Sequence, residues 1–154
     1  MIAAIPYAAN ACAAALAEWD CLEAVVPLSV AFGESDDPNR LAVALTKLTG
    51  DGTWCEQAWV SGKGTVHGHA QLLRAWADHP TPGLVMACQG LVGGHADRSY
   101  PGRRAQLAAI EVLHCLGQPP DPTPTLEAII AAGGETSAEA DQVMAQVRGS
   151  VPYQ

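Results

Sequence analysis

Aliphatic side chains recur every three or four residues along most of this chain, which is the period of an α-helix rather than of a strand. The clearest stripe is Leu41, Leu45 and Leu48, which follows the helix-start signal Asp37-Pro38 and ends at Gly50. Similar stripes bounded by proline or glycine predict helices near residues 7–26, 53–62, 66–79, 82–92, 101–116, 124–132 and 136–148. The pattern predicts an all-α fold, a compact bundle of about seven or eight short helices.

Helix ends are predicted from capping residues. Thr53 to Glu56 and Thr136 to Glu139 each match a capping box, in which a hydroxyl and a carboxylate satisfy free N–H groups at a helix start. Pro27 is expected to stop or kink the first helix, whose predicted buried face carries Cys12, Leu16, Trp19, Leu22 and Val26.

The domain organisation is predicted from one proline-rich stretch. Four of the eleven prolines lie in residues 117–124, which favours an extended connection. We expect a single helical domain over residues 1–154, with core helices in 1–116, this connection in 117–124, and a C-terminal helical hairpin in 125–150. We find no convincing internal repeat.

Composition narrows the classes of partner. The net charge of −8 repels phosphate backbones and anionic lipid, so we expect no nucleic-acid partner. No apolar run approaches the roughly 18 to 20 residues of a membrane span, so no membrane association is expected either. The five cysteines are widely spaced and lie mostly in apolar segments. This distribution predicts buried free thiols, which are typical of a reducing compartment, so we expect a cytoplasmic protein.

Two short motifs suggest cofactor chemistry. Residues 61–65, Ser-Gly-Lys-Gly-Thr, look like the tail of a nucleotide-binding phosphate loop, but Gln57 stands where its first glycine belongs. We interpret them as an interhelical turn. His114-Cys115 suggests a thiol nucleophile, yet neighbours on a helix diverge by about 100°, so adjacency does not bring the two side chains together.

His67-Gly68-His69 suggests a metal site. Residues two apart on a helix point about 200° from each other, which places His67 toward solvent and His69 in the apolar stripe. A third, remote ligand such as Cys55, His79 or His95 is also required. We therefore predict no metal and no cofactor, and the candidate ligands, if a metal were bound, are His67, His69 and His95.

Residues 93–104, Gly-Gly-His-Ala-Asp-Arg-Ser-Tyr-Pro-Gly-Arg-Arg, gather polar side chains between two apolar helices. Loops on a rigid scaffold often carry binding residues. Two arginines lie in the first turn of the next helix, where the helix dipole disfavours cations, so we expect them to face an anionic group, the protein's own carboxylates included. The candidate catalytic residues are His95, Asp97 and Tyr100, and the candidate partner-binding residues are Arg98, Tyr100, Arg103 and Arg104.

Tryptophans supply the other candidate contacts. Trp54 and Trp59 are five residues apart and share no helical face, so we expect one of them to be an exposed interface anchor, while Trp19 and Trp76 are expected in the core. The resulting hypothesis is a non-catalytic helical protein-interaction module that binds a protein partner or a second copy of itself.

Two other functions remain open at this point. The first is a small metal-assisted or hydrolytic enzyme, in which His67, His69, His95 and Asp97 converge. The second is an acidic inhibitor of a basic protein partner, which would bind through Glu34, Asp36 and Asp37.

Overall fold

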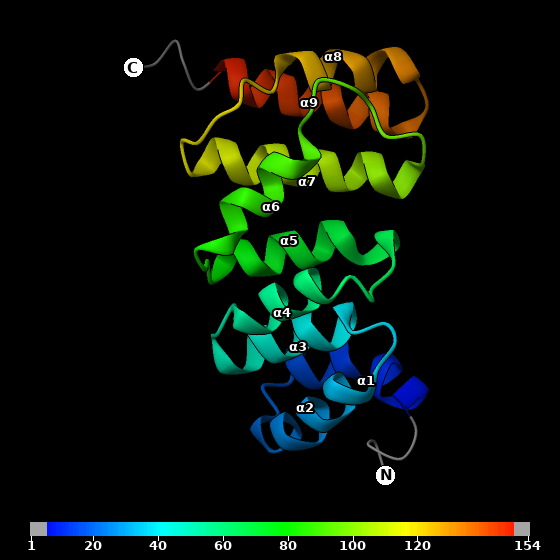
Figure 1. Cartoon of the computed structure of the whole chain (residues 1–154), viewed down its shortest axis with the longest axis vertical. Coiled ribbons are helices and arrows are strands. Elements are labelled where there is room, and N and C mark those ends of the chain that lie inside the picture. The colour runs from blue at the N-terminus through cyan, green and yellow to red at the C-terminus, as the bar shows by residue number, and fades with distance from the viewer. Residues whose placement is uncertain (1–5, 150–154) are drawn as a thin grey trace. The chain divides into compact units, whose positions relative to one another are not determined.

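The computed structural model describes residues 6–149, with side chains from residue 12 onward (Figure 1). Nine α-helices and no strand occur in this range, which confirms the all-α fold. The helices are α1 (Pro6–Glu18), α2 (Val25–Glu34), α3 (Asn39–Thr49), α4 (Thr53–Ser61), α5 (His69–Asp78), α6 (Gly83–Leu91), α7 (Tyr100–Cys115), α8 (Thr123–Ala132) and α9 (Glu135–Gly149), with short 3-10 turns η1 (Leu22–Ala24) and η2 (Val66–Gly68) before α2 and α5.

The chain divides into two compact units, residues 1–84 and 85–154, called unit 1 and unit 2 below. The single domain expected from the sequence stays a prediction.

Helix α3 is the centre of unit 1. It packs against α1, α2, α4 and α5, because its leucine stripe and its alanines bury nearly the whole helix. Leu41, Ala42 and Leu45 have no exposed surface. Small residues on α1, among them Ala13 and Ala17, let the backbones approach closely, so the core forms with few aromatic rings.

Unit 2 contains the C-terminal helical hairpin that the sequence predicted. Helices α8 and α9 pack along each other, and α9 also packs on α7 (Figure 1). The buried side chains come from all three helices, with Ile110 and Leu113 from α7, Leu126 from α8, and Val143 and Met144 from α9. A helical hairpin can bury its apolar stripe only against another helix, and α7 provides that surface.

The predicted first helix, residues 7–26, is wrong. Helix α1 ends at Glu18, Asp20 takes a positive φ of 50°, and the chain restarts through η1 into α2. Pro27 lies in the first turn of α2 rather than at the C-terminal end of a helix. The N–H groups of a first turn have no intrahelical acceptor, so a proline, which has no N–H group, is tolerated there. The break turns Trp19 and Leu22 to solvent instead of into the core.

Neither predicted capping box forms. Helix α4 starts at Thr53, whose N–H and hydroxyl donate to Asp51 Oδ1 at 2.9 and 2.6 Å. Glu56 instead accepts hydrogen bonds from the Thr81 hydroxyl and, at 3.2 Å, from the Gly83 N–H, so it holds the start of α6. Helix α9 starts one residue before Thr136, and the Thr136 hydroxyl accepts a hydrogen bond from Arg103 instead of capping the helix.

Two short sequence motifs occur twice along the chain. Ala-Gln-Leu occurs in α5 (70–72) and in α7 (105–107), and each copy is followed by Pro-Thr-Pro, one residue, and a fully buried leucine, Leu84 or Leu126. A Gly-Gly pair then follows in both copies. The stretch between Ala-Gln-Leu and Pro-Thr-Pro is longer in the second copy, which removes any fixed period.

Candidate functional site

A buried amide makes three hydrogen bonds to the backbone in and next to the loop of residues 93–98. Gln106 on α7 is only 3% exposed. Its Nε2 donates to the Leu91 carbonyl at 3.1 Å and to the His95 carbonyl at 2.9 Å, and its Oε1 accepts from the Asp97 N–H at 2.8 Å. Both ends of the amide are thus satisfied by backbone, so this loop is fastened to α7 from inside unit 2.

Asp97 and Ser99 build the start of α7. Ser99 Oγ accepts from the Gly102 N–H at 3.1 Å as an N-cap, and Asp97 Oδ1 accepts from the Ser99 N–H and hydroxyl at 2.9 and 2.8 Å. These hydrogen bonds, the one from the backbone first, lower the pKa of Asp97. A Cβ at Gly102 would collide with the Asp97 carboxylate, which explains the glycine. The remaining catalytic candidate of this loop, His95, is exposed, with Nδ1 3.3 Å from the Gly93 carbonyl.

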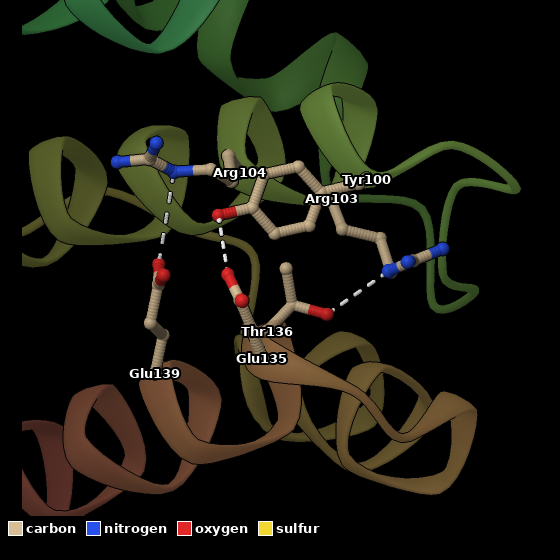
Figure 2. Close-up of polar contacts among 6 residues, drawn as sticks. All are labelled: Tyr100, Arg103, Arg104, Glu135, Thr136 and Glu139. Carbon is tan, nitrogen blue, oxygen red and sulfur yellow. Dashed lines mark hydrogen bonds and ion pairs between the residues drawn. The ribbon is translucent and has the colours of Figure 1, made fainter.

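The two arginines of α7 face their own chain, as the sequence suggested (Figure 2). Arg103 Nε donates to Thr136 Oγ1 at 3.0 Å, and its Nη1 donates to the carbonyls of Asp97 and Arg98. Arg104 Nε lies 3.9 Å from the Glu139 carboxylate, an ion pair too long to be a hydrogen bond.

Tyr100 completes this α7–α9 contact. Its hydroxyl donates to Glu135 at 3.2 Å, and its ring lies under the Arg104 guanidinium, 5.8 Å from the ring centroid (Figure 2). Three of the four predicted partner-binding residues of the loop, Tyr100, Arg103 and Arg104, are therefore engaged in joining α7 to α9. The fourth, Arg98, has an exposed side chain.

The paired histidines of unit 1 have different surroundings. His67 is exposed in η2, whereas the His69 ring packs on Trp59 with centroids 4.8 Å apart. Burial lowers the pKa of His69. Within the described residues no group of three or more His, Cys, Asp or Glu side chains could hold a metal ion.

His67 borders a polar cavity of about 340 Å³ in unit 1, which is also lined by Asn39, Arg40 and Gln71. The buried Asn39 amide donates to the Thr65 carbonyl at 3.2 Å, and a Cβ at Gly64 would collide with it. Gly64, in the phosphate-loop-like motif, thus allows the turn between α4 and η2 to pack closely against Asn39.

The predicted tryptophan anchors are half-buried. Trp54 makes an edge-on contact with Phe32, with centroids 5.4 Å apart, and Trp59 lies between His69 and Trp76. Trp76 is 1% exposed, as expected for the core.

Trp19 was expected in the core and is instead 76% exposed. Leu22, Val26 and Val30 follow it at spacings of three and four residues and are 65%, 71% and 45% exposed. We call these four side chains the Trp19 face. The spacing of these residues is visible in the sequence, where an apolar stripe predicts a buried face. The chain break at Asp20, which the sequence does not show, interrupts that stripe. Exposed apolar patches mark binding surfaces more often than isolated apolar residues do.

The five cysteines differ in burial, and Cys21 is partly buried. Cys55 and Cys88 are fully buried, and burial raises the pKa of these thiols to about 11 and about 12. Cys12 and Cys115 are exposed, contrary to the expectation of buried thiols.

A comparison of the chain with protein-family models, curated proteins and solved structures finds no match. In the described part of the chain, no helix is both long and apolar enough to span a membrane.

Proposed function

We propose that this chain is a non-catalytic protein-interaction module and that the Trp19 face is its contact surface. The observation that carries the proposal is a tryptophan left 76% exposed and followed along the chain by three exposed aliphatic side chains, in a chain with only four tryptophans and one phenylalanine. Tryptophan is among the residues that contribute most binding energy at protein interfaces. Aliphatic neighbours at helical spacing suit a partner that lays an apolar surface along α2.

The geometry of unit 2 supports this choice over the loop of residues 93–104. Tyr100, Arg103 and Arg104 already bind α9, and Asp97 already accepts from Ser99, the N-cap of α7. A partner that recruited these side chains would have to replace existing contacts. The Trp19 face needs no such exchange, because its side chains already point to solvent. We also place the protein in the cytoplasm, because Cys55 and Cys88 are buried free thiols.

The test is a screen of a library of expressed protein fragments, made in parallel with four versions of the chain. These are the unchanged chain, Trp19→Ala, the double variant Leu22→Ser/Val26→Ser, and the matched control Val60→Ser, whose side chain is 77% exposed on α4. We expect partners that bind the unchanged chain and the control but neither face variant. Partners retained equally by all four versions, or no partner at all, would contradict the proposal.

A further inference from the structure

Acidic side chains lie close to the Trp19 face along the chain. Glu18, Asp20, Glu23 and Glu34 are all exposed and lie immediately before, within or after the stretch that carries it. Residues 1–39 contain no Lys, Arg or His, and Asp36 and Asp37 add two further carboxylates. The net charge of the whole chain is −8, so most of the excess negative charge lies in this part of the sequence.

From this combination we infer that the face binds a basic amphipathic helix of a partner protein, an inference that rests on the proposed function. An apolar stripe on such a helix covers Trp19 and the aliphatic side chains, while its flanking Lys and Arg meet the nearby carboxylates. Complementary charge of this kind speeds association and selects among partners with similar apolar stripes.

The dimensions of the face fit a short helix. Leu22, Val26 and Val30 recur every four residues on η1 and α2, so they extend over about 12 Å at 1.5 Å per residue. Trp19 precedes this row by three residues in the chain. A partner helix of about three turns, with apolar residues three and four apart, is long enough to cover it.

The same charges disfavour a second copy of this chain as the occupant. A two-fold dimer through this face would present the same surface on both subunits. The carboxylates of residues 18–34 in one copy would then approach those of the other. Like charges brought together across an interface weaken it.

Three synthetic peptides test the inference with the full chain. All are of equal length and helical propensity. The first carries a leucine stripe flanked by lysines, the second the same stripe flanked by glutamates, and the third the lysines with the leucines scattered around the helix. Fluorescence anisotropy of the labelled peptides gives each dissociation constant. We expect the first peptide to bind at least about tenfold more tightly than the other two, and its affinity to fall as NaCl is raised.

Variants localise the binding to the Trp19 face. Leu22→Ser/Val26→Ser and Glu18→Lys/Glu23→Lys should each weaken the first peptide by about tenfold or more, and the charge reversal should also make binding less sensitive to salt. Val60→Ser and Asp78→Lys are the matched controls, since both side chains are exposed on other helices of unit 1. Circular dichroism confirms that each variant keeps its helical content.

Three results would overturn the inference. Equal affinity for the lysine and glutamate peptides would show that the nearby carboxylates select nothing, and unchanged binding by Leu22→Ser/Val26→Ser would place the peptide elsewhere. Sedimentation equilibrium showing a dimer that the same double variant abolishes would make a second copy the occupant. Any of these can occur while the fragment screen still yields partners lost on Trp19→Ala, so the inference can fail without the proposed function failing.

Discussion

Replacing Gln106 by leucine should destabilise unit 2 far more than a change of one polar side chain on a helix surface. The leucine keeps most of the side-chain volume but makes none of the three hydrogen bonds to Leu91, His95 and Asp97. The affected backbone groups belong to a connection that is partly exposed, so water can reach some of them after the substitution. At about 1 kcal/mol for each lost bond, we expect the free energy of unfolding to fall by about 3 kcal/mol.

Chemical denaturation followed by far-UV circular dichroism measures this loss. Amide hydrogen exchange localises it, because the Asp97 N–H donates to Gln106 Oε1 and should exchange at least about tenfold faster in the variant. Gln71→Leu is the matched control. Gln71 occupies the same place in the other Ala-Gln-Leu copy, and its side chain is exposed, so its replacement should change stability by no more than about 0.5 kcal/mol. Equal stability of Gln106→Leu and the unchanged chain would refute the role given to this amide.

Three further predictions concern unit 1 and the buried thiols. Glu56→Ala should cost about 2 kcal/mol in urea denaturation, because it removes the acceptor at the start of α6, whereas Glu56→Gln, which keeps an acceptor oxygen, should cost less. Since burial lowers the pKa of His69 below its usual 6.5, stability should be full above that pH and fall as the pH drops through the folded-state pKa; His69→Leu should flatten this dependence, and a urea midpoint equally pH-dependent in both proteins would count against it. With pKa values raised to about 11 and about 12, Cys55 and Cys88 should react with a thiol reagent at pH about 8 only after unfolding; rapid labelling of either in the native protein would contradict their burial.

The sequence by itself determined the all-α fold and the C-terminal helical hairpin. The stripe of Leu41, Leu45 and Leu48 needs no tertiary information, because its spacing, its start signal and its terminal glycine all indicate the same helix. The C-terminal hairpin was equally readable from the proline-rich connection before it and the Gly-Gly pair within it. The expectation that the two arginines of α7 face an anionic group came from local physics, since cations at a helix N-terminus gain nothing from the helix dipole. Arg104 does lie near the Glu139 carboxylate, whereas Arg103 hydrogen-bonds to a hydroxyl and two carbonyls.

Tertiary structure decided which polar and apolar side chains are used internally. Glu56 matches a local cap in sequence, yet it serves a helix start 27 residues away, because a carboxylate binds whichever N–H groups the fold brings to it. The identical tripeptides that contain Gln71 and Gln106 leave one amide in solvent and bury the other. Trp19 has the spacing of a core residue, but the helix ends beside it, Asp20 takes a positive φ, and Trp19 is 76% exposed. Periodicity tells which residues share a face of a helix, but what covers that face depends on contacts between residues distant in the chain.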